Sequence, residues 1–172
     1  MRKNKKLMNI VLSALFIALA YVLPFLTGQI PDIGNMLCPM HLPVLLCGFV
    51  CGWQYGLAVG VISPLLRSLT ISMPALFPRA VCMAIELAAY GAVAGLMYKL
   101  LPKKKTYIYL SLVIAMIAGR IVWGFAMYLC MGFLGKSFGF SYFLAEAFLN
   151  ALPGIISQLI IIPVVVMLLK KK

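Results

Sequence analysis

The stretch FPRAVCMAIELAAYG, from Phe77 to Gly91, places two opposite charges inside an apolar run. Arg79 and Glu86 are seven residues apart, which is about two helical turns, so both could lie on one face of a single helix. A charge at the centre of a membrane helix costs about 2.5–3.5 kcal/mol on insertion scales. If this helix crosses a membrane, Glu86 therefore needs a partner.

The composition of the whole chain indicates a bilayer as its solvent. Of the 172 residues, 65% are hydrophobic and only 10% are charged, and the mean hydropathy is +1.09. Soluble domains carry charge on about a quarter of their residues. We therefore expect a multi-pass membrane protein.

Six apolar segments predict six transmembrane helices in one all-α membrane domain that covers residues 1–172. A spanning helix needs about 20 residues. The second and third segments are short, so we expect them to be tilted, kinked or sheltered by their neighbours. The segments are 7–27, 40–52, 55–70, 78–98, 106–133 and 142–169.

The basic residues predict the orientation of these helices. The net charge is +12, and most Lys and Arg residues lie in three clusters, at residues 2–6, 99–105 and 170–172. Clusters beside apolar spans follow the positive-inside rule, so the N- and C-termini are expected in the cytoplasm. Because the charge flanks the spans, a nucleic-acid partner is not expected. The run from Met8 to Thr27 is interpreted as a membrane helix, since it is too long for a signal peptide.

The motifs of common enzymes are absent from the sequence. There is no GxxxxGK[ST] phosphate loop, no HExxH and no GxSxG. His41 is the only histidine and Asp32 the only aspartate, so no catalytic set is credible, and an enzyme is not expected. His41 is interpreted as a histidine at the membrane interface.

The five cysteines do not form a disulfide framework, because their number is odd. Cys47 and Cys51 stand beside Gly48 and Gly52, a pattern of small residues that favours close helix packing. A bound metal is not predicted.

Several charged, polar and aromatic residues are expected at middle or outer depth. Arg120 falls near the middle of the fifth segment, and Trp123, three residues later, is expected on nearly the same face. Basic residues outnumber acidic ones there, which favours a ligand that carries a carboxylate or a phosphate. The candidate substrate-binding residues are Arg67, Arg79, Glu86, Arg120, Trp123, Glu146 and Asn150.

Two interpretations of these charges stay open. Glu86 and Arg120 are expected to pair, either as a structural contact alone or as the floor of an outward-facing pocket. In the second case, Glu146 would lie one turn into the sixth helix and Asn150 one turn deeper.

Three stretches carry a family resemblance that covers nearly the whole chain. They are SALFIALAYVLP, HLPVLLCGFVCGWQYGLAVGVISPLLRS and FPRAVCMAIELAAYGAVAGLMY. With six spans in this length, the chain resembles a substrate-binding S component of the energy-coupling factor (ECF) transporters.

The resemblance implies an outer pocket that binds a vitamin or related micronutrient with high affinity. It implies a prokaryotic plasma membrane and two kinds of partner, a membrane coupling subunit and two ATPase subunits. ATP is then used by these partners, and this chain needs no cofactor. Ala14 and Ala18 match the family's alanine motif, which faces the coupling subunit.

The substrate stays open at this point. Pantothenate suits the basic excess, while pyridoxine, folate, riboflavin and a corrinoid are alternatives. A membrane scaffold without a pocket is the alternative function, and an intramembrane enzyme is a weaker one.

Overall fold

The part of the protein that the structure describes is built from helices joined by short connections. The computed structural model describes all residues except 1, 27–37, 103, 136–138, 147–149 and 171–172. Its described residues contain no β-strand, which confirms the prediction of an all-α protein. The elements are α1 (Arg2–Leu26), α3 (His41–Cys51), α4 (Trp53–Ile71), the π-helical turn η1 (Leu76–Ala80), α5 (Val81–Leu100), α6 (Lys105–Phe133), α7 (Phe140–Leu144) and α8 (Leu152–Lys170).

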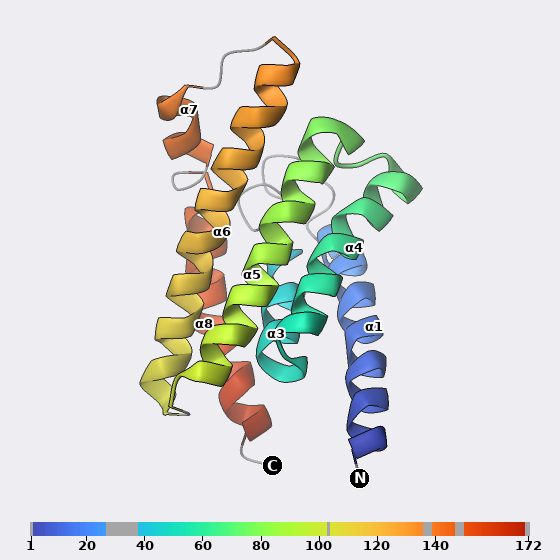
Figure 1. Cartoon of the computed structure of the whole chain (residues 1–172), viewed down its shortest axis with the longest axis vertical. Coiled ribbons are helices and arrows are strands. Elements are labelled where there is room, and N and C mark those ends of the chain that lie inside the picture. The colour runs from blue at the N-terminus through green and yellow to red at the C-terminus, as the bar shows by residue number, and fades with distance from the viewer. Residues whose placement is uncertain (1, 27–37, 103, 136–138, 147–149, 171–172) are drawn as a thin grey trace.

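Four of the described helical stretches are long and apolar enough to cross a membrane. They are Asn4–Phe25, Leu76–Leu100, Lys105–Phe133 and Leu152–Leu169. The chain is thus a helical protein of the multi-pass membrane type, and six spans remain a prediction. Figure 1 shows both chain ends at the same end of the bundle as the α5–α6 connection. That arrangement agrees with termini on one side, whereas their cytoplasmic location remains a prediction.

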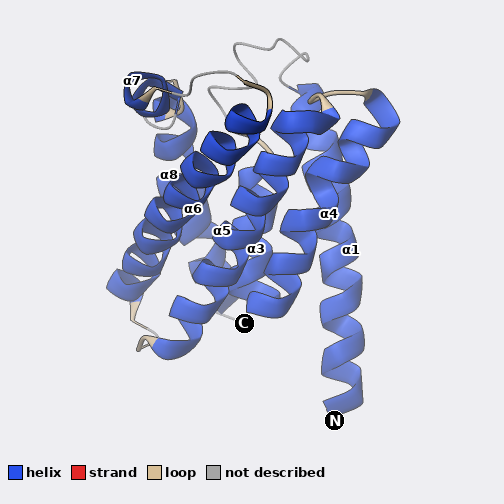
Figure 2. Ribbon diagram, turned by 45° about the horizontal axis from the view of Figure 1, so that its top comes forward, coloured by secondary structure: helices blue, strands red, loops and turns tan. Residues whose placement is uncertain are grey.

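The short second segment is the central helix α3. It has 11 residues, most of them buried, and it packs against α1, α4, α5 and α8. Figure 2 shows how the longer helices stand around it. The expectation that a short segment is sheltered by its neighbours is therefore confirmed for α3.

Glycines let the backbones of α3, α4 and α5 approach one another closely. An added Cβ at Gly48 would lie 2.5 Å from the carbonyl oxygen of Gly91, and one at Gly95 would lie 2.5 Å from the backbone nitrogen of Trp53. An added Cβ at Gly91 would overlap the backbone of Gly56. Between α3 and α4, Gly52 has a φ of 102°, which favours glycine. The close packing that the sequence predicted beside Cys47 is confirmed at Gly48, whereas no described atom lies within 4 Å of a Cβ added at Gly52.

The sixth helix predicted over 142–169 is confirmed over residues 152–169, but its predicted start is wrong. The chain forms the short helix α7, and α8 begins only at Leu152, after a turn at residues 150–151. Pro153 explains this start, because proline lacks an N–H donor and is tolerated in the first turn of a helix. Glu146 and Asn150 precede α8 and so do not lie on its successive turns.

Arg79 and Glu86, whose spacing would allow them on one helix face, lie in different environments. Arg79 is exposed in η1, whereas Glu86 is 3% exposed in α5. The π-helical turn with non-helical backbone at Phe77 precedes α5, and a π turn shifts the angular positions of its residues relative to an α-helix.

Candidate functional site

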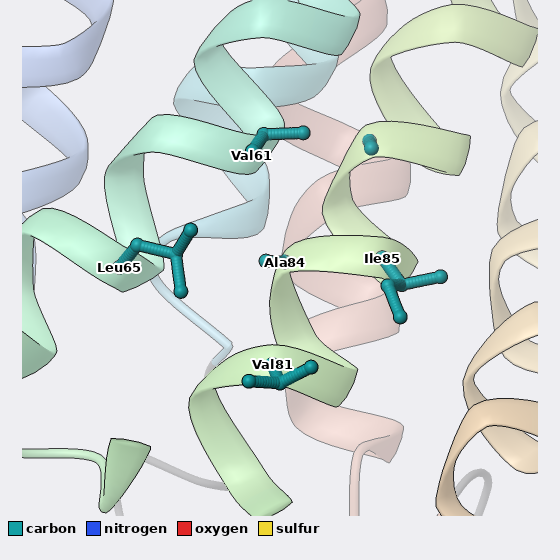
Figure 3. A pocket seen from close by; sticks show the side chains of 6 residues that line it. Val61, Leu65, Val81, Ala84 and Ile85 are labelled. Carbon is teal, nitrogen blue, oxygen red and sulfur yellow. The ribbon is translucent and has the colours of Figure 1, made fainter. Parts of the chain in front are cut away.

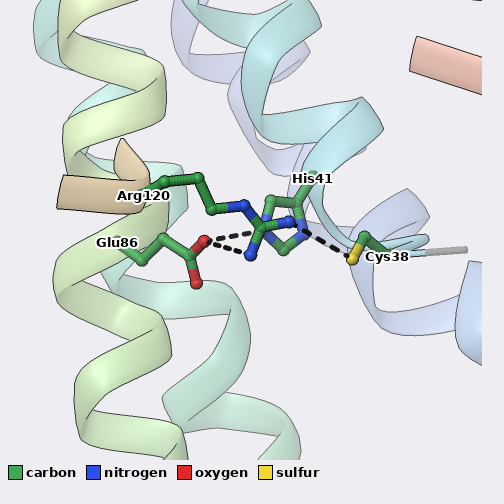
Figure 4. A network of polar contacts seen from close by, with 4 residues as sticks. All are labelled: Cys38, His41, Glu86 and Arg120. Carbon is green, nitrogen blue, oxygen red and sulfur yellow. Dashed lines mark hydrogen bonds and ion pairs between the residues drawn. The ribbon is translucent and has the colours of Figure 1, made fainter. Parts of the chain in front are cut away.

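Four buried polar residues meet where α3, α5 and α6 approach one another (Figure 4). Arg120 of α6 donates through Nη1 to Glu86 Oε1 of α5 at 3.0 Å. Its Nη2 donates to Cys38 Sγ, just before α3, at 3.9 Å. His41 Nε2, at the start of α3, lies 3.5 Å from the same Glu86 oxygen. We call Cys38, His41, Glu86 and Arg120 the polar cluster.

Local packing holds the polar cluster in place. The backbone N–H of His41 donates to the carbonyl of Cys38 at 3.0 Å, which fixes the entry into α3. The ring of His41 meets the ring of Tyr90 edge-on, with 5.1 Å between centroids. Tyr90 packs against Gly119, where an added Cβ would lie 2.7 Å from the tyrosine ring. Gly119 therefore makes room for Tyr90 beside Arg120.

The polar cluster is almost fully buried, yet some of its polar atoms are unsatisfied. The residues are 3% to 8% exposed. Among the described residues, Nδ1 and Nε2 of His41 and Nε of Arg120 have no hydrogen-bond partner. His41 Nε2 approaches Glu86 Oε1 to 3.5 Å without forming a hydrogen bond. Buried polar groups normally have partners, so these three atoms are candidates for contact with a ligand.

Electrostatics link Glu146 to this site. Burial raises the pKa of the Cys38 thiol, Arg120 opposes that shift, and the charges of Glu86 and Glu146 reinforce it. The thiol is therefore kept neutral, and its sulfur serves as an acceptor for Arg120. Glu146 is half-buried.

Arg67 lies in a different environment. It is 5% exposed on α4, and its Nη1 donates to the carbonyl oxygen of Tyr21 at 3.0 Å. Its guanidinium carbon lies 5.0 Å from the centroid of the Phe25 ring. Arg67 thus joins α4 to α1, and its described contacts do not include the polar cluster.

The other candidate residues are spread over the surface and the α6–α7 contact. Arg79 and Asn150 are exposed. Trp123 is half-buried and stacks on Phe143 of α7, with 6.2 Å between ring centroids. Only Glu86 and Arg120 of the seven candidates meet in the polar cluster. Asp32 and Lys136 lie outside the described residues.

Ala14 and Ala18 are both exposed on α1, whereas Ala20 is fully buried. The alanine pair therefore faces outward and does not pack inside the described part of the chain. This placement leaves its predicted role in docking open.

A separate apolar groove lies between α4 and α5 (Figure 3). Its volume is about 340 Å³, and it is lined by Val61, Leu65, Val81, Ala84, Ile85 and Ala88. No titratable side chain lines it. This groove is therefore not the polar pocket that the sequence predicted.

The sequence interpretation missed His41 and Cys38 as members of the site. His41 was placed at the interface, but it is 3% exposed. One signal in the sequence could have pointed to His41. The charged residues at middle depth needed polar partners, and the only histidine of the chain was an available one. Its approach to Glu86 depends on how α3 packs between the longer helices, which periodicity does not reveal.

A bundle of apolar helices around a buried polar cluster defines a membrane protein with a candidate site for a small molecule. The family of substrate-specific components of ECF transporters matches residues 8–166, so the chain belongs to this family. The family is one of transporter components and not of enzymes. No curated protein and no solved structure matches the chain.

Proposed function

We propose that this protein binds a vitamin or related micronutrient at the polar cluster and delivers it inward with an ECF module. The observation that carries the proposal is a set of buried atoms on His41 and Arg120 that have no hydrogen-bond partner among the described residues. In a folded protein such atoms are costly unless a partner satisfies them. A bound molecule would supply that partner, in a family whose members are substrate-specific.

The proposal also includes the protein partners that are expected for a member of this family. A membrane coupling subunit would contact the exposed face of α1 at Ala14 and Ala18, because small side chains permit close approach of another helix. Two ATPase subunits on the coupling subunit would use the ATP, and this chain would hold no cofactor. The expected location is the plasma membrane of a prokaryote.

Native mass spectrometry of the gently purified protein tests the binding proposal. A co-purified molecule of vitamin-like mass is expected, because a tightly held ligand survives purification. The same protein, stripped of ligand, should show a higher melting temperature in the presence of that molecule, since binding to the folded state alone stabilises it.

The His41→Phe variant provides the specific arm of this experiment, and Tyr98→Phe provides its control. Tyr98 lies 12 residues from Glu86 on α5, which is about 18 Å along the helix. Loss of the ligand in His41→Phe but not in Tyr98→Phe supports the site. If both variants retain the ligand, the ligand binds outside the polar cluster. If the folded protein neither holds a ligand nor gains thermal stability from one, the proposed function is contradicted.

A further inference from the structure

The polar cluster carries opposite charges that cancel. Arg120 and Glu86 are 3.0 Å apart, and both are at least nine-tenths buried. The guanidinium of Arg120 and the carboxylate of Glu86 together carry a net charge of zero. A ligand at this cluster therefore meets no unneutralised cation among its described residues.

The basic excess that favoured an acidic ligand lies elsewhere. Arg67 is bound to the carbonyl of Tyr21 and to the ring of Phe25 on the α1 side. Arg79 is exposed in η1. The charge of Glu146 also acts on the Cys38 thiol, with the same sign as that of Glu86. An added carboxylate or phosphate would thus meet repulsion from Glu146 and the desolvation cost of a buried anion.

The unpartnered atoms indicate which groups a ligand needs. Arg120 Nε is a donor, so it requires an acceptor. A neutral imidazole offers one donor and one acceptor, so Nδ1 and Nε2 of His41 require one of each from the ligand. Amides, alcohols and ring hydroxyls supply both in a small space without charge.

We infer that the polar cluster selects an uncharged molecule with neighbouring hydrogen-bond donor and acceptor groups, in preference to its carboxylate or phosphate analogue. The inference rests on the proposed function, and it names the substrate class of the same site. Glu86 sets this selectivity, because its carboxylate neutralises Arg120. Cys38 assists by occupying the second terminal nitrogen of the guanidinium.

Matched pairs of probes that differ in charge test the inference. The pairs are nicotinamide with nicotinate, panthenol with pantothenate, biotinamide with biotin, and pyridoxine with pyridoxine 5′-phosphate. Titration calorimetry on the purified full chain, at a pH of about 8 where free imidazole is uncharged, gives the two Kd values of each pair. For the pair that binds, the neutral member should bind at least about tenfold more tightly.

The Glu86→Gln variant supplies a second reading. It keeps the side-chain shape and frees the charge of Arg120, so the preference should move about tenfold towards the acidic member. Lys99→Gln, at the far end of the same helix α5, is the control, since it changes the total charge at an exposed position and should leave the preference unchanged.

The outcomes separate the two proposals. Tighter binding of the acidic member by the wild-type chain would overturn the charge selectivity and leave micronutrient binding intact. An unchanged preference in a folded Glu86→Gln variant would overturn the assigned role of Glu86. Failure of every probe and of the co-purified molecule to bind would overturn the proposed function, and the selectivity with it.

Discussion

Arg120 Nη1 lies 3.0 Å from Glu86 Oε1, and the two residues are 34 positions apart on the neighbouring helices α6 and α5. Removing one member of a buried ion pair leaves the other charge without compensation, at a cost of about 3–5 kcal/mol. Arg120→Met should therefore destabilise the protein by about this amount. The double variant Glu86→Leu with Arg120→Met should be less destabilised than the sum of the two single variants. Thermal unfolding in detergent measures this double-mutant cycle, and additive effects would show that the pair is not coupled.

His41 combines a packing contact with unpartnered ring nitrogens. His41→Phe keeps an aromatic ring against Tyr90, with its present edge-on geometry at 5.1 Å, and removes both nitrogens. We expect little loss of thermal stability and a loss of ligand affinity of about tenfold or more, the effect of one or two lost hydrogen bonds. Calorimetry with the co-purified ligand measures the affinity. Unchanged affinity in the folded variant would remove His41 from the site.

Arg67 should act on stability and not on binding. Its bond to the Tyr21 carbonyl joins α4 to α1, and a hydrogen bond from a charged donor contributes about 1.5–3 kcal/mol. Arg67→Gln should lower the unfolding temperature and leave the Kd for the ligand within about twofold. A large change in the Kd for the ligand without a change in stability would show that Arg67 does contribute to substrate binding.

The contact between Gly56 and Gly91 should tolerate no side chain. An added Cβ at Gly91 would overlap the backbone of α4, and forced overpacking costs about 1–3 kcal/mol or more. Gly132→Ala on α6 is the control, because no neighbouring atom lies within 4 Å of its added Cβ. Thermal unfolding should show a marked loss for Gly91→Ala and no loss for Gly132→Ala. Equal stabilities would mean that α4 and α5 are less tightly packed.

Ala14 and Ala20 allow docking to be separated from folding. Ala14 is exposed and Ala20 is fully buried on the same helix. Ala14→Trp should abolish uptake by the assembled transporter and leave ligand binding near normal, because a bulky side chain blocks close helix approach. Ala20→Trp should instead prevent stable folding. Paired uptake and binding assays distinguish these effects, and normal uptake by Ala14→Trp would exclude this face as the docking surface.

Much of the architecture was predictable, because it depends on local patterns. Long apolar runs indicated α1, α5 and α6 to within a few residues at most of their ends, and Gly48 beside Cys47 indicated close packing. The prediction was wrong at the last segment, where the turn at residues 150–151 separates α7 from α8. Apolar composition continues through that turn, so hydropathy alone did not reveal it.

The candidate site was predictable only in part. Glu86 and Arg120 were expected to pair because an isolated charge is costly in an apolar surrounding. Arg67 was grouped with them by depth, yet it binds α1. Depth along a helix can be read from sequence, but the direction in which a side chain points depends on the helices packed around it.

The amino-acid sequence by itself determined that this chain folds as apolar helices and that its mid-depth charges must find partners. Both consequences follow from the free energy of placing apolar and charged groups in a membrane. The tertiary structure alone decided which groups meet. It brings His41 and Cys38 to Glu86 and Arg120 and keeps Arg67 apart, because contacts between residues distant in the chain are set by how the short helix α3 packs among its longer neighbours.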